Sequence, residues 1–256
     1  TARSIINGGP LAVNNDASVL KLLYDEYRRR LPRYVIYSEI RPVFEMSGVE
    51  NALIELGFER KGHYNLVLPL SPSEDELLAA MHKKRRREIK KSIEFGLTFR
   101  ELYSEEDITE AVKIVRDTYY RKHVPFTHFD VLLRIRKEAP DFIHYFGAFF
   151  EGKMIASKVD LCYKRLVYAW FAGSKTEFFS YYPNDFLMWH LICWSKSNGY
   201  EKLDFGGGGE PGVPYGVRDY KMKYGCELCE YGRYLMIHHP LIYKLGSIYS
   251  KKVIKR

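Results

Sequence analysis

The order of predicted strands and helices between residues 97 and 237 restricts the fold of this chain more than any other feature. Apolar residues recur every three to four positions in the predicted helices, and at every second position or in short runs in the predicted strands. A capping sequence, Ser104-Glu105-Glu106-Asp107, opens the first helix. In chain order we predict a strand at 98–102, a helix through 108–119, a helix at about 129–138, strands at 142–150, 154–163 and 166–173, a helix at 184–197, a strand at 200–205, a helix at 217–224 and a strand at 228–237.

This order predicts a mixed sheet with helices on both faces. Three consecutive strands joined by tight turns such as Glu151-Gly152 pair antiparallel, whereas a helix between two strands returns the chain for parallel pairing. The helix at 184–197 is apolar nearly all round, so we expect it to be buried. The fold class predicted for residues 97–237 is therefore α/β, of the α+β kind with a mixed sheet.

Residues 1–70 repeat only the second half of that order. The predicted elements are a strand at 3–6, a helix at 17–31, a strand at 34–38, a helix at 49–56 and a strand at 64–70. Half a domain leaves one face of its sheet bare, so we predict a tandem repeat whose first domain is truncated at its N-terminus. The missing part is on the order of 70 residues, from usual element lengths. The alternative is that residues 1–70 extend a single mixed sheet.

A basic segment at 71–96 links the two blocks. Ser73 opens a predicted helix that continues without a break to Gly96 and is densely basic between residues 83 and 91. One interpretation is a solvated helix face. The other is a phosphate-binding ridge formed by Arg85, Arg86 and Arg87, because arginine makes two-pronged contacts with phosphate groups.

Composition narrows the class of protein. The 256 residues are 46% hydrophobic and include 21 Tyr and 15 Phe, which excludes a disordered chain. A formal net charge of +8 favours an anionic partner, such as nucleic acid, a phosphorylated substrate or an acidic membrane face. Four cysteines, with a single Cys-x-x-Cys at Cys226 and Cys229, give neither a disulfide framework nor a predicted metal site. Cysteines packed around a strand fit a reducing cytoplasm, so we expect a cytoplasmic protein. No transmembrane span is recognisable in the given sequence.

Three segments carry a resemblance to a known family: 182–189, 197–207 and 216–225. They contain a helix that ends in Gly199, a strand that ends in Asp204-Phe205-Gly206-Gly207, and the sequence Gly216-Val217-Arg218-Asp219-Tyr220-Lys221-Met222-Lys223-Tyr224-Gly225. They resemble the FemABX and BioF2-like group of the GNAT superfamily, which has Asp-Phe-Gly-Gly followed by Gly-x-x-x-Phe-Lys-x-x-Phe-Gly. Tyrosine replaces both phenylalanines of that motif here. The basic segment resembles the family's arginine-rich helix, and the element order of 97–237 is the GNAT order.

The resemblance implies tandem GNAT-like domains at 1–70 and 97–237 and a transferase that moves an acyl, typically an aminoacyl, group onto an amine. It implies aminoacyl-tRNA as the donor, a peptidoglycan or other cell-envelope precursor as the acceptor, a role in cell wall biogenesis, and no bound cofactor. Two alternatives remain: an acyl-transferring enzyme that uses acetyl-CoA or another acyl-CoA, and a binding module without catalytic activity.

The segment 173–185 bears on the choice of donor. A GNAT enzyme that uses acetyl-CoA holds the pyrophosphate on a glycine-rich loop whose N–H groups meet the phosphates at a helix N-terminus. Here Gly173 is followed by no further glycine, and the segment carries Glu177 and four aromatic residues. The sequence therefore disfavours CoA as the donor.

Lys221 and Asp204 are the predicted catalytic residues. Aminolysis of an ester places negative charge on the carbonyl oxygen, and a cation directed at that oxygen lowers the barrier. Lys221 falls on the motif lysine, which the resemblance implies stabilises charge on the donor or transition state; a surface lysine packed on Tyr224 is the alternative. Asp204 orients the donor or acts as a base, or it caps the turn that follows its strand.

The predicted substrate-binding residues surround the same motif. Tyr168 and Arg121 lie where family members contact the acceptor, with a core residue and a helix-end charge as the respective alternatives. Consecutive glycines allow close approach of the backbone to a ligand, or form a flexible turn. The complete substrate-binding set is Tyr168, Arg121, Gly206, Gly207, Gly208 and Tyr220.

The tail at 238–256 alternates between apolar and basic residues. It predicts an amphipathic helix on an anionic membrane, which suits a lipid-linked acceptor and peripheral attachment to the inner face of the cell membrane. Packing on the neighbouring domain is the alternative.

Overall fold

A computed structural model describes residues 2–124 and 129–254 of the chain. It forms two compact units, each assembled from segments that are distant in the sequence. Unit 1 consists of Thr1–Asn65, Gly207–Pro214 and Cys229–Arg256, and unit 2 consists of Leu66–Gly206 and Tyr215–Leu228.

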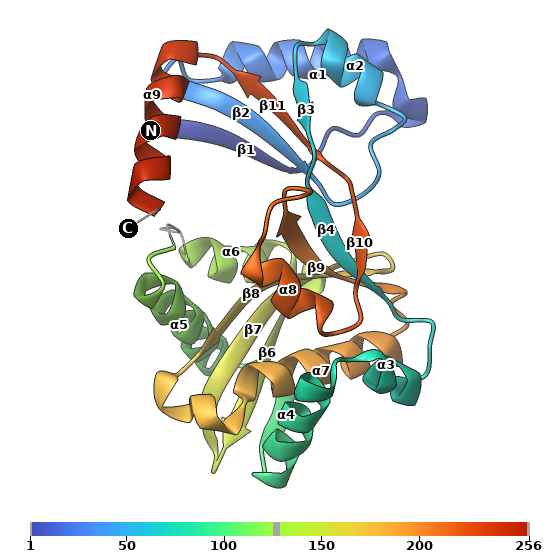
Figure 1. The fold of residues 1–256 in the computed structure, drawn as a ribbon, viewed down its shortest axis with the longest axis vertical. Helices are drawn as coiled ribbons and strands as arrows, with labels where there is room; N and C mark the ends of the chain where they lie inside the picture. Colours follow the sequence, from blue (N-terminus) through green and yellow to red (C-terminus); the bar gives the residue numbers. More distant parts are fainter. Residues whose placement is uncertain (1, 125–128, 255–256) are drawn as a thin grey trace. The chain divides into compact units, whose positions relative to one another are not determined.

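Unit 2 is built on a seven-stranded sheet in the order β10-β4-β9-β8-β7-β6-β5 (Figure 1). The strands from β5 to β8 pair antiparallel, and β8 pairs parallel with β9. The mixed sheet predicted for this part of the chain is confirmed. Its strands are β4 (Tyr64–Pro69), β5 (Thr98–Glu101), β6 (Ile143–Phe150), β7 (Lys153–Tyr163), β8 (Leu166–Ser174), β9 (Lys202–Gly209) and β10 (Glu227–Cys229).

Helices cover both faces of this sheet and enclose a core on each. On one face, α5 (Glu105–Arg121) and α6 (Asp130–Glu138) bury Val115 and Leu132 against the strands. On the other face, α7 (Pro183–Ser197) buries Leu187 and Leu191, together with residues of α3 (Glu74–Ala80) and α4 (Lys83–Glu94). The burial predicted for the helix at 184–197 is confirmed, because α7 lies between the sheet and α4 (Figure 1).

The basic segment forms two helices, so the single helix predicted for it is wrong. The chain leaves helical geometry at Met81, which is 2% exposed and belongs to the core beneath α7. His82 then starts α4, its Nδ1 accepting the Lys84 N–H at 3.2 Å. Burial of Met81 and the new cap compensate for the interrupted helical hydrogen bonds.

The four consecutive glycines lie in a strand. β9 continues through Gly206 to Gly209, so the flexible loop considered for these residues is wrong. Gly206 has a φ of 75°, in a region that side chains rarely adopt, and glycine is suited to this position.

Unit 1 contains a four-stranded sheet in the order β1-β2-β11-β3, formed by β1 (Ala2–Gly8), β2 (Val35–Pro42), β11 (Arg233–Ile237) and β3 (Glu59–Lys61). Helices α1 (Ala17–Arg30) and α2 (Glu50–Glu55) cover one face, where Leu20, Leu53 and Tyr234 share a core. On the opposite face, α9 (Pro240–Ile254) contacts β2 through Tyr243, whose ring centroid lies 5.4 Å from that of Tyr37. Residues 255 and 256 of the predicted tail lie outside the described residues.

The two sheets do not follow the contiguous boundaries predicted at residue 70 and at 97–237. β4 was expected to close the first block, and it lies between β9 and β10 in the sheet of unit 2. β11 was expected to close the second block, and it lies between β2 and β3 in the sheet of unit 1. The order β1-α1-β2-α2-β3 matches β8-α7-β9-α8-β10, where α8 is Gly216–Met222. A tandem repeat with a truncated first domain stays a prediction.

Candidate active site

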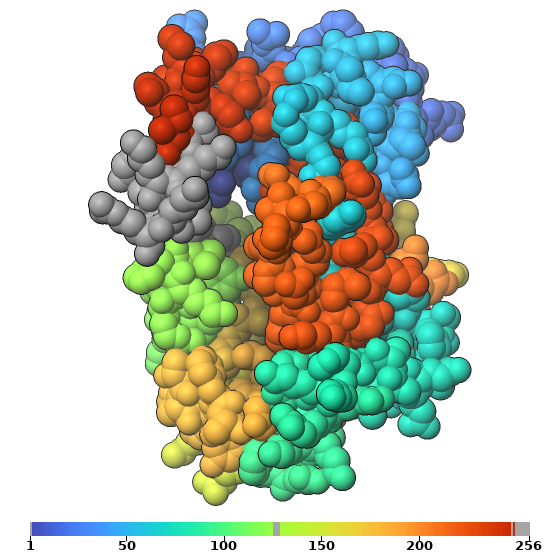
Figure 2. Space-filling model, in the orientation of Figure 1, coloured from blue at the N-terminus to red at the C-terminus, as the bar shows by residue number. Residues whose placement is uncertain are grey.

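Strands β8 and β9 diverge, and a cleft opens between them in unit 2. Their pairing runs from Leu166 opposite Lys202 to Tyr168 opposite Asp204 and ends there, although β8 continues to Ser174. The cleft has a volume of about 740 Å³ and is lined by the second half of β8, Phe205, the C-terminal end of α5, the start of α7, and α8. Figure 2 shows a hollow beside α8, the orange helix.

Lys221 lines this cleft from α8 and is half-buried. Burial lowers the pKa of its ammonium group to about 8, against the opposing attraction of the Asp204 carboxylate. A pKa near neutrality allows a lysine to change charge in the physiological range. The structure thus brings Lys221 to the cleft and within electrostatic reach of Asp204, and its catalytic role stays a prediction.

Asp204 is fully buried at the point where β8 and β9 part. Its Oδ1 accepts the N–H of Gly206 at 2.6 Å, so the carboxylate caps the turn of backbone that follows it, as one of the two interpretations expected. The same carboxylate favours the charged form of Lys221. Asp204 is not among the described residues that line the cleft, and its catalytic role stays a prediction.

Tyr168 and the glycines pack on each other and on other side chains. A Cβ on Gly206 would lie 3.3 Å from the Tyr168 hydroxyl, and one on Gly207 would lie 3.0 Å from His63 Nε2, inside unit 1. None of Tyr168, Gly206, Gly207 and Gly208 is among the described residues that line the cleft. The ligand contact predicted for these four residues stays a prediction.

Arg121 lies in the last turn of α5 and lines the cleft. Its Nη2 donates to the Ser174 carbonyl at 3.1 Å, and Thr118 Oγ1 accepts the Ser174 N–H at 3.1 Å. A Cβ on Gly173 would lie only 2.6 Å from the Ile114 carbonyl, so glycine is required where α5 crosses β8. The end of β8 is therefore fixed to α5 at the edge of the cleft.

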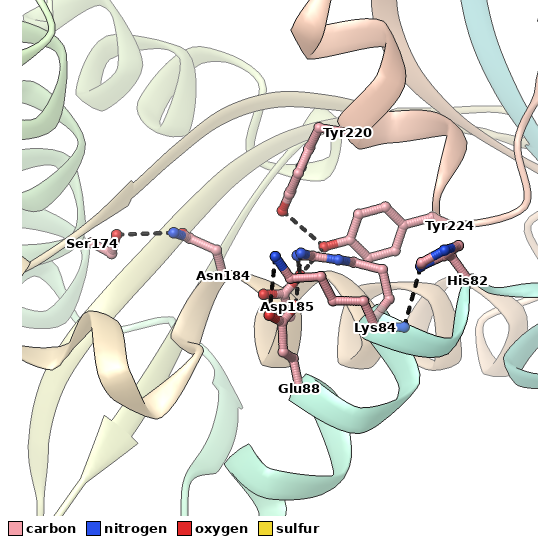
Figure 3. Close-up of polar contacts among 9 residues, drawn as sticks. His82, Lys84, Glu88, Ser174, Asn184, Asp185, Tyr220 and Tyr224 are labelled. Atoms are coloured by element: carbon pink, nitrogen blue, oxygen red, sulfur yellow. Dashed lines mark hydrogen bonds and ion pairs between the residues drawn. The ribbon is translucent and has the colours of Figure 1, made fainter.

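A buried polar cluster joins α4, α7 and α8 behind the cleft (Figure 3). Arg85 pairs with Asp185, and its Nη2 lies 2.7 Å from Glu88 Oε2. Arg85 is 7% exposed, so the phosphate-binding role predicted for it is wrong: its guanidinium already neutralises two buried carboxylates. Arg86 and Arg87 are exposed, and for them that role stays a prediction.

The tyrosines that replace the family's phenylalanines extend this cluster to the cleft. The Tyr224 hydroxyl donates to Asp185 Oδ1, and the hydroxyls of Tyr220 and Tyr224 lie 2.8 Å apart. Burial raises the pKa of Tyr224 well above its ordinary value, so its hydroxyl remains a donor. Tyr220 lines the cleft, and its ring lies beneath Arg85, whose Cζ is 5.1 Å from the ring centroid. Each tyrosine hydroxyl thus has a structural use.

Sequence reasoning missed Lys158 and Asp160. Lys158 lines the cleft although it is 3% exposed, and its Nζ lies 3.4 Å from Asp160 Oδ1. Burial raises the pKa of Asp160, and the Lys158 ammonium opposes that rise. The signal was present: two charged residues two positions apart, and so on one face, interrupt an apolar central strand. Among the described residues, no group of His, Cys, Asp and Glu is placed to hold a metal ion.

The connection from β8 to α7 is a short 3₁₀ helix, η3 (Thr176–Tyr181). Pro183 occupies the first turn of α7 and has no N–H, while Asp185 and Phe186 donate theirs to the Tyr182 carbonyl. Asp185 also places a carboxylate in that turn. This helix start therefore offers few donors to an anion. No helix in the described parts of the chain is long and apolar enough to cross a bilayer.

Comparisons with known proteins agree with this fold. Residues 79–222 match the acetyltransferase (GNAT) domain family, which is more than half of the chain. No curated protein matches the sequence. A crystal structure of FemX superimposes with a TM-score of 0.71 at 15% identity, covering 94% of this chain and 82% of that one.

Two further solved structures have a similar fold. The C-terminal domain of a putative lysylphosphatidylglycerol synthetase from Agrobacterium fabrum gives a TM-score of 0.65 at 16% identity, covering 98% of this chain and 82% of that one. L-PGS from Bacillus licheniformis gives 0.60 at 17% identity, covering 92% and 77%. The GNAT-like fold predicted from the order of elements is confirmed, and the chain belongs to the GNAT family of acyltransferases.

Proposed function

We propose that this GNAT acyltransferase transfers an aminoacyl group from aminoacyl-tRNA to an amine of a cell-envelope precursor, as a cytoplasmic enzyme. The observation that carries the choice of donor is the start of α7. A pyrophosphate needs several N–H groups directed at it from a helix N-terminus. Here Pro183 has no N–H group, and the N–H groups of Asp185 and Phe186 are already bonded to the Tyr182 carbonyl.

The cleft suits an ester donor. The neutral amine nitrogen attacks the ester carbonyl carbon, the carbon–oxygen ester bond breaks, and the ribose hydroxyl leaves with a proton that the amine has lost. Negative charge collects on the carbonyl oxygen before that bond breaks. Lys221, in its protonated form, stabilises this charge from the wall of the cleft.

The surface of α4 supports a nucleic-acid donor. Arg86 and Arg87 are exposed on this helix beside Lys83 and Lys84, and the four positive charges suit a phosphate backbone. The similarity in fold to FemX and to lysylphosphatidylglycerol synthetases supports the same class of reaction.

A direct transfer assay tests the donor. Purified protein is incubated with radiolabelled aminoacyl-tRNA or with radiolabelled acetyl-CoA, each with a peptidoglycan precursor that carries a free amine. Phosphatidylglycerol vesicles serve as a hydroxyl-bearing comparison. We expect label to reach the amine from aminoacyl-tRNA only. Transfer from acetyl-CoA alone would reject the proposed donor in favour of an acyl-CoA-dependent N-acyltransferase.

Lys221→Met tests whether Lys221 takes part in catalysis. We expect the variant to fold and to transfer at least 10²-fold more slowly, the usual effect of losing one group that stabilises an oxyanion. The matched control is Lys223→Met, two positions away at the C-cap of α8 and outside the set of residues that line the cleft. Equal rates for the wild-type protein and the Lys221 variant would remove Lys221 from the mechanism.

A further inference from the structure

Lys158 is a charged residue in an apolar part of the sheet. It lies in the middle of β7, in a stretch where all neighbours from Met154 to Val159 are buried, and it is itself 3% exposed. Moving an ammonium group out of water costs several kcal/mol unless the protein compensates it. A methionine would fill the same space without that cost, so packing alone does not explain a lysine here.

The cleft gives the Lys158 ammonium a route to a ligand. Its cross-strand neighbour on β8 is Ala172, and cross-strand neighbours project from the same face of a sheet. Ala172 is exposed and lines the cleft beside Lys158. Only a methyl group therefore separates the lysine from the open space on that side.

Asp160 pairs with the Lys158 ammonium without using all of its N–H donors. The carboxylate is fully buried, and its Oδ1 also accepts the Trp170 N–H at 3.1 Å, which fixes it to β8. Asp160 is the one partner of Lys158 among the described residues. An ammonium group has three N–H donors, and buried donors in proteins are almost always hydrogen-bonded. The remaining donors are thus available to an oxygen atom in the cleft.

We propose that Lys158 is a catalytic residue that, together with Lys221, binds the carbonyl oxygen of the acyl donor and stabilises the negative charge that develops there. The proposal rests on the acyltransferase activity and deepens the proposed function. As the amine nitrogen bonds to the carbonyl carbon, the carbonyl π electrons move to the oxygen, and both ammonium groups donate hydrogen bonds to it. When the ester bond breaks, the carbonyl re-forms and the leaving oxygen takes the proton released by the amine. Lys158 neither gains nor loses a proton.

Lys158 and Lys221, two of the cations that line the cleft, also influence one another electrostatically. The charge of Lys158 disfavours the protonated form of Lys221, so the two repel in the free protein. A negatively charged oxygen between the two ammonium groups offsets their repulsion. It does so only once the negative charge has developed on the carbonyl oxygen. An interaction that strengthens in the transition state raises kcat and leaves substrate binding little changed.

A double variant, Lys158→Met with Asp160→Asn, tests the proposal. Replacing lysine alone would leave Asp160 as an unpaired buried charge and could prevent folding, whereas neutralising both partners of a buried pair is often harmless to stability. We expect a melting temperature close to that of the wild-type protein, a kcat reduced about 10²- to 10³-fold, and a KM for the donor within about threefold. Lys153→Met is the matched control, since Lys153 lies on the same strand and is exposed.

The assay uses both aminoacyl-tRNA and acetyl-CoA, which keeps this proposal separate from the proposed donor. Loss of kcat with whichever donor the wild-type protein accepts supports a catalytic Lys158, even if that donor is acetyl-CoA. A folded double variant with at least half of the wild-type kcat overturns the role of Lys158 and leaves the proposed function intact. A wild-type chain inactive with both donors overturns both.

Discussion

Lys221 is the residue whose chemistry depends most on its surroundings. Its pKa of about 8 means that it is mainly protonated at neutral pH and loses its charge just above it. The role proposed for it requires the protonated form. A general base would require the neutral form, so the pH dependence of the rate distinguishes the two.

We expect kcat/KM to fall as the pH rises through about 8, because the ammonium of Lys221 is lost over that range. In Lys221→Arg the guanidinium stays charged at every accessible pH, so this fall should be absent even if the overall rate is lower. The measurement is a rate profile from about pH 6 to 10 for both proteins. An identical alkaline fall in the arginine variant would assign it to another group.

The same pKa predicts an effect on stability. The folded-state pKa lies below the ordinary value of 10.5, so the unfolded chain binds more protons between about pH 8 and 10.5 and stability rises with pH in that window. Relative to Lys221→Met, the wild-type protein should gain on the order of 1–3 kcal/mol between pH 7 and 11, allowing for partial exposure. Urea unfolding at the two pH values measures this change, and a constant difference between the proteins would contradict it.

Helix α8 and the residues that directly follow it connect the cleft to the buried cluster, through Tyr220 in the helix and Tyr224 after its end. Tyr224 is fully buried and donates to Asp185, whereas Tyr220 is 36% exposed at the cleft. Removing a hydroxyl that serves a buried carboxylate costs about 1–3 kcal/mol. We therefore expect Tyr224→Phe to lower the free energy of unfolding by that amount and Tyr220→Phe to lower it by less. Denaturant titration of both variants checks the order, and a larger loss for Tyr220→Phe would contradict it.

Helix α9 presents an apolar stripe to solvent. Leu241, Leu245 and Ile248, at helical spacing, are all exposed, and lysines flank them in the sequence. We propose that this stripe contacts an anionic membrane, as expected from the sequence of the tail. The full chain should then co-sediment with vesicles of phosphatidylglycerol and phosphatidylcholine, and less with phosphatidylcholine alone.

A matched pair of variants isolates that stripe. Leu245→Glu places a charge among the apolar residues of α9 and should abolish sedimentation with vesicles. Leu22→Glu makes the same change on α1, where Leu22 is also exposed, and should have no effect. Equal loss in both variants would point to general charge repulsion, and no loss in either would exclude α9 as the contact.

At the scale of the whole molecule, sequence patterns predicted individual helices and strands but missed contacts between segments that are distant in the chain. The periodicity of apolar residues located α5, α7 and the strands β6 to β8, because each element buries one face or all of its surface. The sequence motif around Lys221 also located the cleft, because residues of the motif that are close in the sequence, such as Tyr220 and Lys221, line the cleft together. Arg85 was misjudged because its partner Asp185 is distant in the chain, and a charge run gives no sign of one buried member.

The placement of β4 and β11 was beyond sequence reasoning altogether. Both strands are largely apolar, and their sequences fit burial in either sheet. The pattern of apolar residues along the chain therefore does not indicate which sheet each strand joins. In the structure β4 joins the sheet of unit 2, where β11 was expected, and β11 joins the sheet of unit 1, where β4 was expected. The consequence is that neither predicted domain, as a contiguous segment, contains all strands of its sheet.

This exchange predicts which fragments fold. Residues 64–230 contain every strand of the unit 2 sheet, and residues 71–230 differ only by lacking β4. β4 contributes Leu66 and Leu68, which are 0% and 3% exposed in the main core, and it separates β9 from β10. Loss of one buried leucine costs about 2–5 kcal/mol, so losing both costs about 4–10 kcal/mol, which is comparable to the usual stability of a domain, about 5–15 kcal/mol. We expect 64–230 to show a cooperative thermal transition and dispersed amide resonances, and 71–230 to show neither. A folded 71–230 fragment would mean that β4 is dispensable and that the contiguous boundary near residue 70 describes the domain after all.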